Sequence, residues 1–208
     1  MARMVSASLN KGLIAYNSIS ASLWMLVLFI TVVLGGLGGQ PLLFDKTSWV
    51  LIAVQSLAII EVYNAATGIV RSPIFTTAMQ VASRLLIVWG ICYFNKSSPA
   101  NRSVAYITLT LAWSVTEIIR YSYYAHHLRD PQHVPRWLLW LRYTTFYVLY
   151  PLGVASECYM IWATIPYVGT ATKALFWVVL LAYIPGFYTL FTYMIKQRKK
   201  ALNKEKEY

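Results

Sequence analysis

The chain has 208 residues, of which 58% are hydrophobic and 12% charged, whereas a water-soluble domain of this size carries about a quarter charged residues. This composition excludes an ordinary soluble domain and favours a protein embedded in a lipid bilayer. The formal net charge of +11 does not indicate nucleic-acid binding, because no basic face with interleaved aromatic residues lies outside the apolar runs.

Six apolar runs approach or exceed the roughly 20 residues that an α-helix needs to cross the hydrocarbon core of a bilayer. In chain order they cover residues 13–37, 49–70, 74–94, 104–125, 137–165 and 174–195. Turn-rich or charged segments separate them, the first being the glycine-rich stretch 35–41. The sequence therefore predicts an all-α integral membrane protein: a six-helix transmembrane bundle that forms a single domain over residues 1–208 and ends in a basic tail, 196–208.

Basic residues between these runs are divided unequally between the two sides of the predicted bundle. The side that holds both termini carries eleven: Arg3, Lys11, Arg71, Arg129, Arg136, Lys196, Arg198, Lys199, Lys200, Lys204 and Lys206. The opposite side carries four: Lys46, Lys96, Arg102 and Lys173. Because positively charged loops tend to stay in the cytosol, the asymmetry predicts that both termini are cytosolic.

Three arginines and three glutamates lie inside the predicted spans: Arg84, Arg120, Arg142, Glu61, Glu117 and Glu157. Each would cost several kcal/mol if it faced lipid, so we expect these side chains to point into the bundle and meet one another or a polar cavity. Glu117 and Arg120 are three residues apart and can pair on one helix face, which is equally compatible with a purely structural role. Arg142 lies near the cytosolic end of its span and is expected to snorkel.

The densest polar stretch in apolar surroundings lies in the fifth run, at residues 141–157. Tyr143, Tyr150 and Glu157 recur every seven residues, which places them near one stripe of a helix, and Tyr147 lies one turn before Tyr150. Pro151 is expected to kink the helix. On an ideal helix the Tyr150 and Glu157 alpha carbons are roughly 10 Å apart, a separation that suits a substrate held between them.

A carboxyl group deep in a span is difficult to ionise, so Glu157 is available as a proton acceptor or donor. Tyrosine more naturally donates a proton or a hydrogen bond. The same stripe also fits an aromatic packing surface in which Glu157 forms a salt bridge with an arginine. The positions alone do not name a reaction.

Five ordered motifs carry a resemblance to a known family: GIVRSP at 68–73, QVASRLLIVWG at 80–90, AWSVTEIIRYSYY at 112–124, LRYTTFYVLYPLGVASE at 141–157 and YIPGFYTLFTYMIKQRKK at 183–200. Over nearly its whole length the chain resembles the very-long-chain (3R)-3-hydroxyacyl-CoA dehydratases, also called protein-tyrosine-phosphatase-like proteins, and most of all the fungal members. The second name does not imply phosphatase activity, because neither Cys92 nor Cys158 is followed six residues later by an arginine.

The resemblance implies an enzyme of the endoplasmic reticulum membrane that converts long- and very-long-chain (3R)-3-hydroxyacyl-CoA to trans-2-enoyl-CoA, the third step of fatty-acid elongation. It implies Tyr150 and Glu157 as catalytic residues. Glu157 is the expected base and Tyr150 the expected acid or hydrogen-bond donor, with the reverse assignment left open. The intramembrane residues expected to support them are Arg84, Glu117, Arg120, Arg142, Tyr143 and Tyr147.

No cofactor or metal is expected. The expected partners are the acyl-CoA substrate, membrane lipid and the other elongation enzymes: a ketoacyl-CoA synthase, a ketoacyl-CoA reductase and an enoyl-CoA reductase. A transporter or proton pathway is the main alternative, since intramembrane Glu and Arg also mark ion routes. An inactive scaffold of the elongation complex is a third possibility. The terminal KEKEY sequence resembles a dilysine retrieval signal, and it is also compatible with a solvated basic tail.

Overall fold

The structure is a computed structural model that describes residues 7–70 and 72–205, and the regular structure in these two segments is helical. The longer helices are α1 (Ala7–Leu37), α2 (Leu42–Ser56), α3 (Ile59–Ala66), α4 (Ile74–Leu85), α5 (Val104–Arg129), α6 (Arg136–Thr144), α7 (Phe146–Thr164) and α8 (Thr170–Glu205). A π-helical stretch, Leu86–Tyr93, continues α4, and short 3₁₀ turns occupy Pro99–Arg102 and Ile165–Tyr167. The prediction of an all-helical protein is confirmed for this part of the chain.

Five helical stretches of the described residues are long and apolar enough to cross a bilayer: Ala7–Leu37, Leu42–Ala66, Ile74–Tyr93, Phe146–Tyr167 and Thr170–Asn203. They correspond to five of the six predicted runs. The remaining run, residues 104–125, falls on α5, which has 26 residues but is more polar. α5 packs against both α1 and α7, so its polar side chains, Glu117 among them, can be buried against protein.

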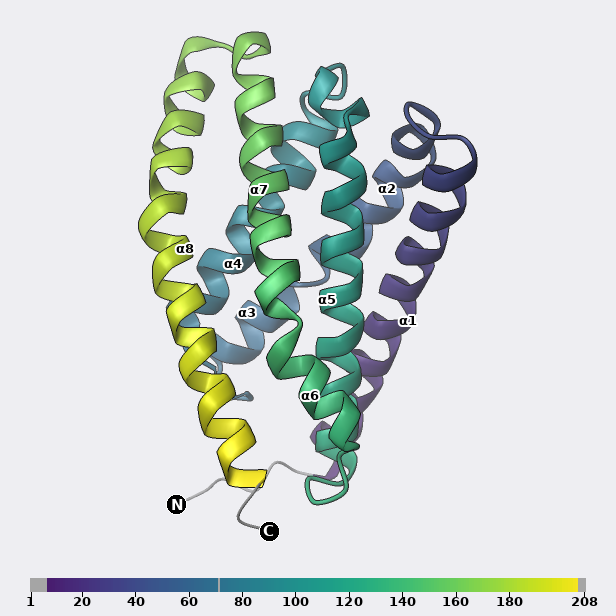
Figure 1. Ribbon diagram of the computed structural model, residues 1–208, viewed down its shortest axis with the longest axis vertical. Helices are drawn as coiled ribbons and strands as arrows, with labels where there is room; N and C mark the ends of the chain where they lie inside the picture. The colour runs from purple at the N-terminus through teal and green to yellow at the C-terminus, as the bar shows by residue number, and fades with distance from the viewer. Residues whose placement is uncertain (1–6, 71, 206–208) are drawn as a thin grey trace.

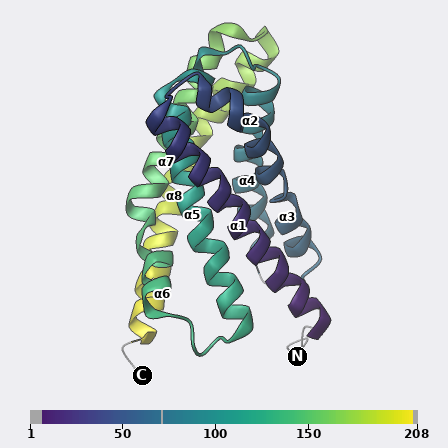
Figure 2. The ribbon, with the colours of Figure 1, turned by 90° about the vertical axis from the view of Figure 1, so that its right-hand side faces the viewer.

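The helices form an elongated bundle (Figure 1) in which α8 lies beside α7 and α5 separates α7 from α1. The start of α1 and the end of α8 lie at the same end of the bundle, together with the connection between α5 and α6 (Figures 1 and 2). The connection between α7 and α8 lies at the opposite end. The chain therefore begins and ends its described helices on one side.

The outer surface of the bundle is apolar. Along α8, the side chains of Val178, Leu181, Ile184 and Tyr188 are each at least 64% exposed. Large side chains such as Trp113, Phe44 and Met160 fill the interior instead. An exposed apolar helix face of this kind is typical of a helix that faces lipid, which agrees with the composition.

The largest differences from the predicted boundaries are at the start of the second span and at the end of the last one. The second span begins at Leu42 and not at residue 49. The charged residues Asp45 and Lys46 resemble a loop in the sequence, but they lie in the first turns of α2. Asp45 is favourable there, since the N-terminus of a helix attracts negative charge, and it also pairs with Arg102 at 3.0 Å. At the other end of the chain, α8 continues past residue 195 to Glu205.

The fifth predicted span is two helices, α6 and α7, which meet at Thr145. The amides of Val148 and Leu149 both bond the Thr145 carbonyl, at 3.1 and 3.0 Å. Pro151 lies inside α7, and because proline has no N–H it cannot donate to the carbonyl one turn before it. The helical pattern is thus interrupted on the amino-terminal side of Pro151, and Tyr143 lies on a different helix from Tyr150 and Glu157.

The glycine-rich stretch after α1 forms a defined turn. α1 includes Gly35 and Gly36, and the amides of Gly38 and Gly39 both bond the Leu34 carbonyl at 2.9 Å. Gly39 has φ +61°, the left-handed conformation that commonly ends a helix and that favours glycine. The turn therefore allows α2 to fold back beside α1.

Candidate active site

Glu157 is a buried carboxyl group on α7 that is bound by two other helices. The indole N–H of Trp113, on α5, donates to Glu157 Oε1 at 2.9 Å. The hydroxyl of Tyr183, on α8, bonds Glu157 Oε2 at 2.6 Å. With only 6% of Glu157 exposed, these two contacts replace the hydration that the carboxyl would have in water.

Tyr150 lies two turns before Glu157 on the same helix and also faces α8. Its ring is stacked on Phe187, with ring centroids 5.3 Å apart, and on Phe191 at 6.4 Å. Among the hydrogen bonds of the described residues, none involves the Tyr150 hydroxyl. The ring is therefore held by packing, and its hydroxyl is available to a ligand.

A network of ion pairs lies next to this carboxyl group. Arg84 of α4 pairs with Glu117 of α5, and Arg120 donates to Glu117 through Nε at 2.7 Å. Arg120 also makes a bidentate pair with Glu61 of α3, at 2.6 and 2.7 Å. The predicted pairing of Glu117 with Arg120 is confirmed, and these four intramembrane charges meet one another as expected.

Arg84 of this network contacts Trp113, the residue whose indole N–H bonds Glu157. The Arg84 guanidinium lies 5.2 Å from the centroid of the Trp113 ring, the same ring whose N–H bonds Glu157. In the network two arginines balance two glutamates, and Arg84 is already paired with Glu117. Among the ion pairs of the described residues, none includes Glu157.

The three other predicted supporting residues lie toward the end of the bundle that holds α6. Arg142 bonds the Tyr124 hydroxyl at 3.4 Å and lies 5.7 Å from the Tyr143 ring centroid. Tyr143 packs edge-on against Tyr123 of α5. Tyr147 contacts Arg198 of α8. These contacts are made with neighbouring aromatic rings and with Arg198, and none of them reaches Glu157.

Sequence reasoning missed the two direct partners of Glu157. Trp113 and Tyr183 occur in apolar runs, where an aromatic residue is ordinarily a packing or interface residue. A signal existed for Trp113, which is four residues before Glu117 and therefore on the same face of α5. Tyr183 could be found only from the placement of α8 beside α7.

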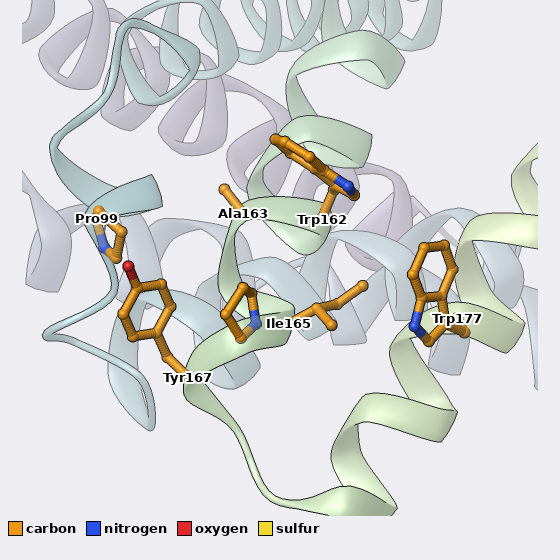
Figure 3. A pocket seen from close by; sticks show the side chains of 7 residues that line it. Pro99, Trp162, Ala163, Ile165, Tyr167 and Trp177 are labelled. Atoms are coloured by element: carbon orange, nitrogen blue, oxygen red, sulfur yellow. The ribbon is translucent and has the colours of Figure 1, made fainter.

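A hollow of about 450 Å³ lies at the end of the bundle where α7 connects to α8. Its lining residues (Figure 3) are Pro99, Trp162, Ala163, Ile165, Pro166, Tyr167 and Trp177. The lining contains neither Tyr150 nor Glu157 and has no titratable carboxyl or basic group. We therefore place the candidate chemistry at Glu157 and not in this hollow.

Comparison with known proteins gives consistent matches. The family model described as "Protein tyrosine phosphatase-like protein, PTPLA" matches residues 55–204. The "Probable very-long-chain (3R)-3-hydroxyacyl-CoA dehydratase" of Schizosaccharomyces pombe is 41% identical over 89% of each chain. The "Very-long-chain (3R)-3-hydroxyacyl-CoA dehydratase hpo-8" of Caenorhabditis elegans is 42% identical over 94% of this chain and 96% of its own. The human protein named "Very-long-chain (3R)-3-hydroxyacyl-CoA dehydratase 2" is 33% identical over 94% of this chain and 82% of its own. No solved structure matches this chain significantly.

Proposed function

Because this chain belongs to the protein tyrosine phosphatase-like family, PTPLA, we propose that it acts, as its relatives are named to act, on very-long-chain (3R)-3-hydroxyacyl-CoA. The reaction is a dehydration to trans-2-enoyl-CoA, the third step of fatty-acid elongation, which makes the protein a carbon–oxygen lyase. The observation that carries the proposal is the match with dehydratases along nearly the whole chain.

Loss of water requires two proton transfers. A base removes the proton from C2, beside the thioester, and an acid protonates the hydroxyl as its bond to C3 breaks and the electron pair leaves with oxygen. We assign Glu157 as the base and Tyr150 as the acid. The proton that Glu157 gains then returns to the Tyr150 phenolate, so that water is the only product besides the enoyl-CoA.

The contacts of the two side chains support this division. Both oxygens of Glu157 are hydrogen-bonded by side chains from other helices, so the carboxyl is already oriented before a substrate arrives. The Tyr150 hydroxyl has no hydrogen-bond partner in the described chain and can therefore donate to a substrate hydroxyl. The spacing of roughly 10 Å along α7 leaves room for C2 and C3 between them.

The membrane arrangement is part of the proposal. We infer six membrane spans, in which α5 crosses the bilayer in addition to the five apolar stretches. The start of α1 and the end of α8 would lie in the cytosol. Support comes from the 26-residue length of α5, its place between α1 and α7, and four basic residues near the end of α8, which are Lys196, Arg198, Lys199 and Lys200. Residues 1–208 would then form one catalytic domain with a cytosolic tail at 196–208.

We further propose residence in the endoplasmic reticulum membrane and contact with the other elongation enzymes. The location is what the family resemblance implies. The contacts are expected because the substrate is the product of one elongation enzyme and the product is the substrate of another. The expected retrieval sequence KEKEY extends into residues 206–208, which lie outside the described part, as do Arg3 and Arg71.

The test uses purified protein in liposomes with a 3-hydroxyacyl-CoA of long chain, and mass spectrometry of the products. We expect trans-2-enoyl-CoA, with rates that fall about 10²–10⁴-fold in Glu157→Gln and in Tyr150→Phe. Tyr188→Phe, on an exposed position of α8, is the matched control and should retain activity. Ion flux without dehydration would support a transporter, and a protein that lacks both activities yet supports elongation would be a scaffold.

A further inference from the structure

The Glu157 carboxyl has two hydrogen-bond partners of different chemical kinds. Trp113 is 2% exposed and bonds Oε1, and Tyr183 bonds Oε2. An indole N–H can only donate, whereas a tyrosine hydroxyl can donate or accept. Oε1 therefore remains an acceptor whether the carboxyl is ionised or protonated, and a proton that Glu157 takes up sits on Oε2.

Tyr183 can serve both states of the carboxyl. Its hydroxyl donates to Oε2 when Glu157 is ionised and can accept from Oε2 when Glu157 is protonated. A carboxylate oxygen has two lone-pair sites, so Oε2 can hold this contact and still face a C–H bond of the substrate. The arrangement matches the two protonation states through which a catalytic base passes in every turnover.

Trp113 is itself held by a residue of α4. The guanidinium of Arg84 lies over the Trp113 ring and is fixed by its pair with Glu117. Three helices besides α7 thus determine where the Glu157 carboxyl points.

We propose that Trp113 and Tyr183 are positioning residues of the dehydratase site, acting through Glu157: Trp113 fixes Oε1 as an acceptor, and Tyr183 supports Oε2 as the atom that takes the proton from C2. The inference rests on the function proposed above. It assigns a tyrosine distinct from Tyr150 to the base, while Tyr150 keeps its role at the departing hydroxyl.

Tyr183→Phe and Trp113→Phe each remove one donor and retain a ring. Because each contact fixes the direction in which the Glu157 carboxyl faces C2, its loss is expected to lower kcat about 10–100-fold, with KM within about twofold of wild type. Tyr188→Phe, which makes the same change at an exposed site of α8, should leave both constants unchanged. Thermal unfolding in detergent identifies a variant that fails to fold. The kinetic constants of the other variant then test the positioning role.

A coupling measurement separates positioning from a general effect on structure. Glu157→Asp keeps a carboxyl but withdraws it by one methylene from both donors. Adding Tyr183→Phe or Trp113→Phe to Glu157→Asp is expected to change the rate by less than about twofold, because the contact is already lost.

Three results would overturn the inference: wild-type kcat in both single variants, a raised KM with unchanged kcat, or the full loss repeated in the Glu157→Asp background. Absence of dehydration by the wild-type protein would instead refute the proposed function, so the two failures are distinguishable.

Discussion

Glu117→Gln offers a direct test of the buried ion-pair network. Glu117 has a side chain that is 4% exposed and accepts from both Arg84 and Arg120. Neutralising it leaves these two arginines with Glu61 alone and one uncompensated positive charge inside the bundle. Breaking a buried pair in this way costs about 3–5 kcal/mol. At about 2–4 °C per kcal/mol for a chain of this size, the midpoint of thermal unfolding should fall by roughly 6–20 °C.

The assay is thermal unfolding of the purified protein in detergent, followed by tryptophan fluorescence. Asp45→Asn is the control, because Asp45 and Arg102 form a pair in which both side chains are at least 40% exposed. A surface pair contributes at most about 1 kcal/mol, so this variant should unfold close to wild type. Glu117→Gln combined with Arg84→Gln restores the charge balance and should be more stable than Glu117→Gln alone. Equal unfolding temperatures for Glu117→Gln and Asp45→Asn, or a double variant that loses the sum of both single effects, would refute the reasoning.

Three further predictions follow from particular positions. Tyr150→Phe keeps the stacking on Phe187 and should unfold within about 2 °C of wild type although it is nearly inactive; a large loss of stability would mean that the hydroxyl has a structural role. Gly39→Ala should lower the free energy of unfolding by about 1–2 kcal/mol, because Gly39 has φ +61°. Gly36→Ala should be neutral or slightly stabilising, because Gly36 lies in helix α1 with open space around a new Cβ. Similar denaturation midpoints for the two variants would contradict the turn geometry. In a background without native cysteines, Lys96→Cys and Lys199→Cys should be labelled by an impermeant thiol reagent from opposite sides of sealed vesicles, and labelling from one side would exclude six spans.

The helical membrane fold was predictable because it depends on the order of residues within each short segment of the chain. Runs of apolar residues match the helices, and the Glu117–Arg120 pair follows from a spacing of three on one helix. Predictions failed where a helix begins or is interrupted. Asp45 and Lys46 made the first turns of α2 resemble a loop. The interruption at Thr145 divides a run that has no proline or glycine between residue 137 and Pro151.

Contacts between helices could not be predicted from one sequence. The pairs Arg84–Glu117 and Arg120–Glu61 join residues 33 and 59 positions apart, and their choice depends on how the helices pack. The same holds for Tyr183 at Glu157, which is 26 positions away on α8. The sequence therefore identified the charged residues and the catalytic candidates, while packing determined which of them meet.

The central claim is that Tyr150 and Glu157 act together on one substrate molecule. Initial rates of trans-2-enoyl-CoA formation by wild type, Tyr150→Phe, Glu157→Gln and the double variant test it most directly. Groups that act as a unit are strongly non-additive, so we predict that the double variant is about as slow as the slower single variant. Full activity in either single variant, or losses that multiply in the double variant, would contradict a shared site.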